Sequence, residues 1–451
     1  MWPLKTVLYF AVFWAFCLAS VVNPIWGVVN YIVAYQLHPP VHWWGLPLVA
    51  IGMRFSMLAT LFLVLGLIFG RKKVPQIRPS FSLWEAGVFG IVAIGALNTV
   101  VGIGFDAIAQ SAFEKFWKLQ VFVFVLARLA TTRRNLNLVI WAIVFGCAFL
   151  GYDAFTAPRW RFNLGRLNAF GGPDIATSSG ASAHLAAMLP IIGIAFLTAK
   201  HRMWKIFAAV SGALTINAVF LCRGRAAFLG ILVGGLTALL LAPRTKRFRV
   251  LILLVIGFLC SFRLSDDVYW QRMATLTNRQ ELAKDYAVEA RMGMLKESFR
   301  ILADYPTGVG LGNFPMAIGP YNPEYWNRSS HNTFVTCFVE LGIFGGMLFL
   351  ALLGGSLWLL YRTSRIAHLT EDPLGTKYLT YGLIVSFATY VVAGLGTERF
   401  SCESFWWVLV LPLCANRMAM REVREVRATV PVRSADAIEE PALWGNVAHA
   451  V

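Results

Sequence analysis

The sequence has few charged residues, and acidic side chains are especially scarce. Only 14% of its 451 residues are charged, with 23 acidic side chains against 40 basic ones, while 58% are hydrophobic. A soluble domain carries about 25% charged residues, so this deficit excludes an ordinary soluble protein. Apolar runs recur along the chain at the length of about 17–25 residues that a bilayer requires. We therefore expect a polytopic membrane protein.

Cysteine and histidine are also sparse, and neither shows metal-binding spacing. The seven cysteines are scattered, mostly within apolar runs, and none pairs at redox or zinc-ligand spacing. We therefore expect no metal and no cofactor. The net charge of +17 comes from basic residues in short loops rather than from a basic face on a soluble domain, which argues against nucleic acid as a partner.

The apolar runs predict an all-α membrane protein of about twelve transmembrane helices, because lipid offers no partners to backbone polar groups outside a helix. Residues 23–37 either extend the first span or form a re-entrant segment after Pro24. The expected spans are 6–22, 43–69, 84–104, 115–130, 136–155, 179–199, 206–221, 226–242, 250–263, 332–361, 378–396 and 403–416.

Basic loops set the predicted orientation. When the spans alternate, these loops fall on one side, which the positive-inside rule assigns to the cytoplasm. Both termini are then cytoplasmic, and the lipid bilayer is the main surrounding partner. The predicted parts are nine spans in 1–263, one large periplasmic loop at 264–331, three spans in 332–418, and a polar tail at 419–451 that we expect to be disordered.

Several arginines lie on the predicted outer side, against the charge rule. Arg161 and Arg166 belong to one loop, and Arg223 and Arg225 lie between two apolar runs. An arginine at the membrane edge is costly unless it reaches the interface or binds an anion, and its planar fork suits a phosphate. Contact with lipid headgroups is the alternative for these residues.

The large loop is predicted to contain a helix over 281–304. Arg291 lies on the flank of this helix, whose expected packing face holds Met292, Leu295, Phe299 and Leu302. The glycines at 308–312 predict a tight turn rather than a dinucleotide-binding fingerprint, because no βαβ unit surrounds them. At the base of the loop, Asp266 and Asp267 either bind a cation or face water.

The loop ends at His331-Asn332, directly before the next apolar run. An imidazole titrates near neutral pH and can act as a general base. A lone histidine is often structural, so His331 acquires a chemical meaning only with its neighbours.

Four motifs, in this order and on the same predicted side, resemble the O-antigen ligase and polymerase superfamily of bacterial envelope glycosyltransferases. The sequence departs from the family pattern at two places. Cys222 stands where the family usually has serine, and Pro173-Asp174 stands where an asparagine is common. The motifs are Gly165-Arg166-Leu167 with the following segment to Pro190, Leu221-Cys222-Arg223-Gly224, Arg291 with Asp304-Tyr305-Pro306-Thr307-Gly308-Val309-Gly310, and His331-Asn332 with Glu340-Leu341-Gly342-Ile343-Phe344-Gly345.

The resemblance implies an enzyme that transfers a glycan from an undecaprenyl-diphosphate carrier to an acceptor hydroxyl. The acceptor would be lipid A-core or another glycan or protein, and the reaction would face the periplasm at the bacterial inner membrane. The family pattern implies that His331 is the general base and that Arg223 and Arg291 stabilise the diphosphate. Arg166 is a weaker candidate for the same role, and we also expect Arg161, Arg225 and Asn332 to contribute to substrate binding.

Three functions stay open at this point. A glycan ligase and a repeat-unit polymerase share the same chemistry, and the single large periplasmic loop favours the ligase. A transporter or flippase would need charges inside the spans and paired inverted repeats. Arg54 is the main intramembrane charge that the sequence suggests, and no repeat is evident, so transport is disfavoured.

Overall fold

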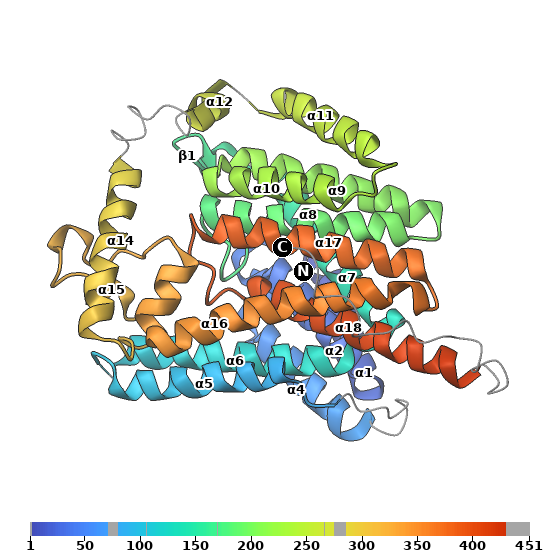
Figure 1. Ribbon diagram of the computed structural model, residues 1–451, viewed down its shortest axis with the longest axis horizontal. Helices are drawn as coiled ribbons and strands as arrows, with labels where there is room; N and C mark the ends of the chain where they lie inside the picture. The colour runs from blue at the N-terminus through green and yellow to red at the C-terminus, as the bar shows by residue number, and fades with distance from the viewer. Residues whose placement is uncertain are drawn as a thin grey trace, which may run out of the picture.

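The computed structural model describes residues 2–70, 80–104, 106–168, 170–265, 267–274 and 286–429. In these ranges the regular structure is almost entirely helical, as predicted, and α14 and α15 cover one end of a bundle of long helices (Figure 1). The helices are α1 (Leu4–Val22), α2 (Ile25–Leu37), α3 (Leu46–Ala50), α4 (Phe55–Phe69), α5 (Leu83–Val101), α6 (Ala107–Leu129), α7 (Arg133–Phe155), α8 (Ser178–Thr198), α9 (Arg202–Cys222), α10 (Arg225–Leu241), α11 (Arg247–Leu264), α12 (Asp267–Ala274), α14 (Tyr286–Asp304), α15 (Phe314–Ala317), α16 (Thr333–Ile366), α17 (Pro373–Gly394) and α18 (Glu403–Thr429).

Six of the described helices are long and apolar enough to cross a membrane, namely α1, α5, α7, α8, α9 and the segment that contains α16. The helices α4 and α10 are apolar but shorter. The total of twelve spans stays a prediction.

The predicted span 43–69 consists of two helices, α3 and α4, with a break between them. Gly52 has a φ of 78°, in the left-handed region, so a right-handed helix cannot continue through this residue. Arg54 lies at this break and is exposed at the start of α4. Arg54 therefore lies between the two helices, and its position relative to the membrane stays a prediction.

Residues 25–37, which the sequence left open, form the separate helix α2. It turns back beside α1 after Pro24. Nδ2 of Asn30 donates to the carbonyl of Phe13 (3.3 Å), which joins the middles of the two helices. Most of its side chains are buried among the neighbouring helices. With only 13 residues, α2 is too short for hydropathy to identify as a span.

Helix α1 runs in the same direction as the segment that ends with α4. Thr6 at its start donates to the carbonyl of Trp44 (2.5 Å), and Ser20 near its end donates to the carbonyl of Phe62 (3.1 Å). The loop around residue 44 lies near Asp153 at the end of α7, because His42 Nδ1 is 3.9 Å from the Asp153 carboxylate.

Helix α7 begins at the other side of the bundle, where Arg133 pairs with Glu422 near the end of α18 (2.7 Å). The start of α1 and the end of α18 therefore lie on opposite sides. The sequence placed both termini in the cytoplasm without counting α2 as a span, and the side of the membrane that each terminus faces stays a prediction.

Arginines join the helices to buried carboxylates at the end of the bundle where α18 finishes. Glu85 of α5 is 1% exposed and accepts hydrogen bonds from Arg417 (2.6 Å) and Arg128 (2.8 Å). Helix α18 continues to Thr429, beyond the predicted boundary at 418, so the segment expected to be disordered begins as a helix. The remaining tail, 430–451, lies outside the described residues.

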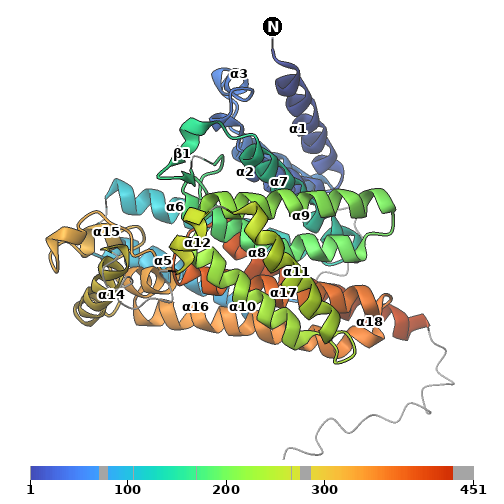
Figure 2. The same cartoon turned by 90° about the horizontal axis from the view of Figure 1, so that it is seen from above.

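Residues 286–331 form a cap over the opposite end of the bundle, as Figure 2 shows from a second side. The cap has its own apolar core, which includes Met294, Ile301 and Phe314 together with Val339 of α16. Of the predicted loop, residues 275–285 and Asp266 lie outside the described part of the chain, so the Asp266–Asp267 pair stays a prediction.

The predicted packing face of α14 is wrong. Met292 and Phe299 are 63% and 67% exposed, while the helix packs through the side that holds Ala290 and Met294. Gly293 accounts for this choice, because a Cβ added there would lie 2.1 Å from the Tyr325 hydroxyl oxygen. The absence of a side chain lets α14 approach the rest of the cap closely on that side.

The glycine turn after α14 fits into an opened turn of α16. Gly342 has a φ of 72° and interrupts the helix. The backbone N–H groups of Val309 and Gly310 donate to the carbonyls of Val339 (2.9 Å) and Glu340 (3.0 Å). A Cβ at Gly308 would lie 2.5 Å from the Gly342 nitrogen, so this position requires glycine. Two motifs far apart in the sequence are therefore one structural unit.

The direction of α1 predicts that tags at the two ends of the chain lie on opposite sides of the membrane. The basic end near α18 is expected to face the cytoplasm. Protease added to intact spheroplasts should therefore remove a tag placed before Met1 and leave a tag placed after Val451. Digestion after detergent lysis is the control that both tags can be cleaved. Protection of both tags in intact spheroplasts would contradict the arrangement.

Candidate functional site

His331 lies where the cap joins α16, in a backbone conformation that few residues adopt. Its φ is 51°, in the left-handed region, where strained residues cluster at functional sites. Ser330 fixes one side of this turn, because its hydroxyl bonds the Asn332 carbonyl (2.9 Å) and the Thr336 hydroxyl (2.6 Å). Asn332 fixes the other side, because its Oδ1 accepts from two first-turn amides of α16 (2.9 and 3.2 Å).

Two arginines surround His331 with positive charge. Arg291 comes from α14 in the cap, and Arg399 comes from the segment between α17 and α18. The imidazole is exposed on one side and enclosed by protein on the others. This desolvation first, and the charges of Arg291 and Arg399 second, lower the pKa of His331 below its usual value. The neutral imidazole, which can accept a proton, is therefore favoured at neutral pH.

Arg399 is a site residue that was not predicted from the sequence. It is 8% exposed, and Nη1 donates to the carbonyl of Asp174 (2.6 Å). Its guanidinium also packs on Gly180 at the start of α8, where an added Cβ would lie 2.9 Å from Nη2. The backbone N–H of Arg399 donates to the hydroxyl of Thr333 (2.9 Å), two residues after His331. Arg399 thus connects the start of the histidine's helix to the segment before α8.

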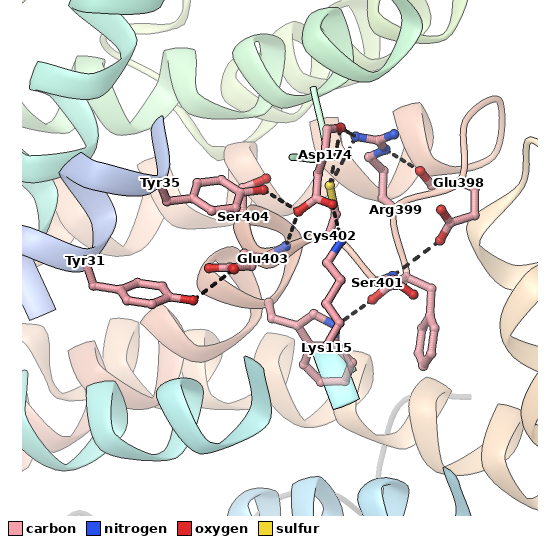
Figure 3. A network of polar contacts seen from close by, with 12 residues as sticks. Tyr31, Tyr35, Lys115, Asp174, Glu398, Arg399, Ser401, Cys402, Glu403 and Ser404 are labelled. Atoms are coloured by element: carbon pink, nitrogen blue, oxygen red, sulfur yellow. Dashed lines mark hydrogen bonds and ion pairs between the residues drawn. The ribbon is translucent and has the colours of Figure 1, made fainter. Parts of the chain in front are cut away.

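Asp174 forms the centre of a buried polar network next to this arginine (Figure 3). Its carboxylate pairs with Lys115 of α6 and accepts a hydrogen bond from Tyr35 of α2. The same carboxylate lies 3.4 Å from the backbone nitrogen of Glu403 at the start of α18, and Glu403 accepts from Tyr31 of α2 (2.9 Å). The network joins α2, α6, α18 and the segment before α8.

The outer segment between α7 and α8 forms a small antiparallel hairpin, with β1 at Phe162–Asn163 and β2 at Arg166–Leu167. Arg161, which directly precedes it, is 8% exposed and donates from Nη2 to Asp153 (2.8 Å). Arg166 is half-buried, and its Nε is buried without a hydrogen-bond partner in the described ranges. Arg166 can therefore receive an anion, whereas Arg161 is held by an internal ion pair.

The junction of α9 and α10 contacts both the hairpin and α8. Arg223 ends α9 with a φ of 50°, and its guanidinium lies over Gly165, where an added Cβ would be 2.2 Å from Nη1. Gly224 packs on Ser182 of α8, because a Cβ there would lie 2.1 Å from the hydroxyl oxygen. Ser182 lies two residues after Gly180, which contacts the guanidinium of Arg399. The first turns of α8 are thus the common support of both arginine-bearing segments.

The structure brings His331 and Arg291 together, and it places Arg223 and Arg225 next to the first turns of α8. Asn332 lies beside His331, but its side-chain oxygen is used as a helix cap. The short polar stretch at 397–404 between two apolar runs was the available signal for Arg399.

Asp174 had no comparable signal in the sequence. Its partners Lys115 and Tyr35 lie 59 and 139 residues away, so their contact follows only from the tertiary fold.

Two large cavities lie at the other end of the bundle, away from His331. One of about 690 Å³ lies among α5, α16 and α18, and one of about 640 Å³ is lined by Arg133, Lys200 and Glu422. We place the candidate active site at His331 because the strained backbone, the two arginines and the buried network converge there. In the described ranges, no group of three or more His, Cys, Asp or Glu side chains could hold a metal ion.

Apolar helices of membrane-spanning length, together with a polar site at one end of the bundle, define a multi-pass membrane protein. Residues 210–350 match the family model described as O-antigen ligase. The matched segment contains Arg223, Arg291 and His331, and the match supports the resemblance to the O-antigen ligase superfamily that the motifs predicted. No curated protein sequence matches the chain significantly.

Replacing Asp174 by Asn should destabilise the protein, because Lys115 then loses its carboxylate partner. The Lys115 side chain is 41% exposed and that of Asp174 is 7% exposed. We therefore expect a loss of about 1–2 kcal/mol, below the ~3–5 kcal/mol of a fully buried pair. Thermal unfolding of the purified protein in detergent measures this loss.

The matched control for that variant is Glu114→Gln in α6, the helix that carries Lys115. It breaks the exposed Lys118–Glu114 pair and should change stability by less than about 0.5 kcal/mol. Equal stability of Asp174→Asn and the wild type would show that the network does not hold the fold.

Proposed function

We propose that the protein is an O-antigen ligase-like glycosyltransferase of the bacterial inner membrane. It transfers a glycan from undecaprenyl diphosphate to an acceptor hydroxyl on the periplasmic side. The observation that carries the proposal is His331, a histidine with a lowered pKa that is held in a strained turn beside Arg291 and Arg399. The family match over 210–350 supports the reaction class.

The proposed reaction exchanges one carbon–oxygen bond for another. The acceptor oxygen attacks the anomeric carbon of the glycan, and the bond from that carbon to the diphosphate oxygen breaks. The acceptor proton passes to the neutral imidazole of His331, which acts as general base. Undecaprenyl diphosphate leaves with the bonding electrons and with increased negative charge.

Arginines stabilise that charge in the proposed mechanism. Fixed guanidinium groups lower the barrier when they are placed where charge develops, and they need no reorganisation during the reaction. Arg223 and Arg291 are the proposed diphosphate ligands, and Arg166 and Arg225 extend the positive surface near them. A planar guanidinium can grip a phosphate through two parallel hydrogen bonds.

Asn332 and Arg161 have supporting roles in this proposal. Asn332 fixes the turn that presents His331, and Arg161 holds the hairpin next to Arg166 through its pair with Asp153. Arg399 positions the start of α16 and contributes charge to the imidazole.

The orientation in the proposal follows from the distribution of charge. Glu85 and Glu422 bind arginines at the end of the bundle that is expected to face the cytoplasm. His331 lies at the opposite end, which then faces the periplasm, where an acceptor such as lipid A-core is presented.

His331→Ala should abolish glycan transfer, because the acceptor hydroxyl loses its base. General-base catalysis contributes about 10²–10⁴-fold to a rate. The measurement is the amount of glycan-capped acceptor formed by a deletion strain that expresses the variant. Membrane abundance should equal that of the wild type, and His201→Ala, at the start of α9, is the matched control. Transfer at the wild-type level by His331→Ala would refute the proposed role.

The charge of Arg399 should set the pH at which transfer fails. A base works in its neutral form, so activity is lost as pH falls through the lowered pKa of His331. Arg399→Gln removes a positive neighbour, raises the pKa of His331 toward its usual value of about 6.5, and moves the acidic limb of the rate profile to higher pH. Arg399→Lys keeps the charge and should leave the limb in place. Equal displacement in both variants would show a purely structural role for Arg399.

A further inference from the structure

The cavity of about 690 Å³ at the basic end of the bundle has no part in the proposed reaction. It lies between α5, α16 and α18, on the side opposite to His331. Its volume lies in the range of about 300–1,000 Å³ that is typical of ligand pockets.

The deeper wall of the cavity is apolar and contains glycines. Leu348, Leu352 and Trp84 contribute apolar surface, and Gly354 and Gly355 leave room on the exposed side of α16. A Cβ added at Gly354 would meet no atom within 4 Å, so this position faces open space. An apolar chain can therefore lie along α16 without displacing a side chain at that position.

The rim of the cavity is basic, and two of its arginines are already paired. Arg417 pairs with Glu85 (2.6 Å), and Arg421 pairs with Glu425 (2.8 Å). Arg421 therefore contributes little net charge to a ligand, and Arg417 shares the charge of Glu85 with Arg128.

The other two rim arginines face the cavity without a carboxylate partner in the described ranges. Arg362 lies over the ring of Trp358 and contacts the sulfur of Met420. Arg424 is exposed. The rim therefore presents two uncompensated positive charges beside an apolar slot.

We propose that this cavity binds an anionic phospholipid from the cytoplasmic leaflet. The phosphate would lie between Arg362 and Arg424, and an acyl chain would follow the slot past Gly354. Basic pockets between membrane helices on the cytoplasmic side suit anionic headgroups. The apolar slot, which opens between helices, selects a lipid over a free phosphate. This proposal is independent of the reaction at His331.

The test is lipid retention by the full-length protein in nanodiscs of phosphatidylglycerol and phosphatidylethanolamine, followed by native mass spectrometry. The wild type should retain phosphatidylglycerol in preference to phosphatidylethanolamine. The variant Arg362→Ala with Arg424→Ala should bind it about 10-fold or more weakly, the loss expected for two charges at an anionic headgroup. Arg244→Ala with Arg249→Ala removes the same number of exposed charges from the first turn of α11 and the loop before it, and should retain the lipid.

A second pair of variants tests the slot itself. Gly354→Leu should displace the lipid while every arginine stays in place, and Gly193→Leu is the matched control, because a Cβ there also meets no atom within 4 Å. Thermal unfolding confirms that all variants are folded. Glycerol phosphate in excess should not compete with the lipid.

Three results would overturn the proposal. One is equal loss of lipid from the two double-arginine variants, which would indicate general surface charge. Another is unchanged retention by Gly354→Leu. The third is preferential retention of undecaprenyl phosphate over phosphatidylglycerol when both are supplied, which would assign the cavity to a different lipid.

Discussion

The carboxylate of Asp174 is the point on which the site depends, because it holds together segments that would otherwise separate. Lys115, Tyr35 and the start of α18 meet at this group, and Arg399 binds the carbonyl of the same residue. A buried carboxylate is costly unless several partners satisfy it. Each partner here belongs to a different helix or loop, so the cost is offset only when all of them are in position.

This arrangement also explains how His331 can be both strained and well placed. The positive φ of the residue is sustained by Ser330 and Asn332, and the helix that follows is held by the contact between Thr333 and Arg399. The guanidinium of Arg399 binds the carbonyl of Asp174 and also adds positive charge near the imidazole. The position of His331 and its proton affinity therefore depend on the same residue, so a mutation that removes the charge of Arg399 changes both.

Much of the helical framework could be predicted from the sequence, because each long span is an apolar run of sufficient length. Helix α2 could not be identified in this way, since its 13 residues are too few for the hydropathy criterion, so the sequence did not indicate that α1 runs parallel to α4. The packing face of α14 was also wrong, because tight approach at Gly293 outweighed the burial of Met292 and Phe299.

His331, Arg223 and Arg291 could be proposed from the sequence because they stand in motifs. Asp174 and Arg399 could not be found in this way, because their contact joins residues 225 apart in the chain.

The length of helix α16 bears on how deep the candidate site lies in the membrane. From Ile343 to Ile366 it rises about 36 Å at ~1.5 Å per residue, slightly more than the ~30 Å of bilayer hydrocarbon. Gly342 thus divides α16 into a first part that carries the candidate site and a second part that is long enough to cross the hydrocarbon by itself. In the proposed function, the first part would then lie in the headgroup layer, at the depth where the diphosphate of a lipid-linked donor rests.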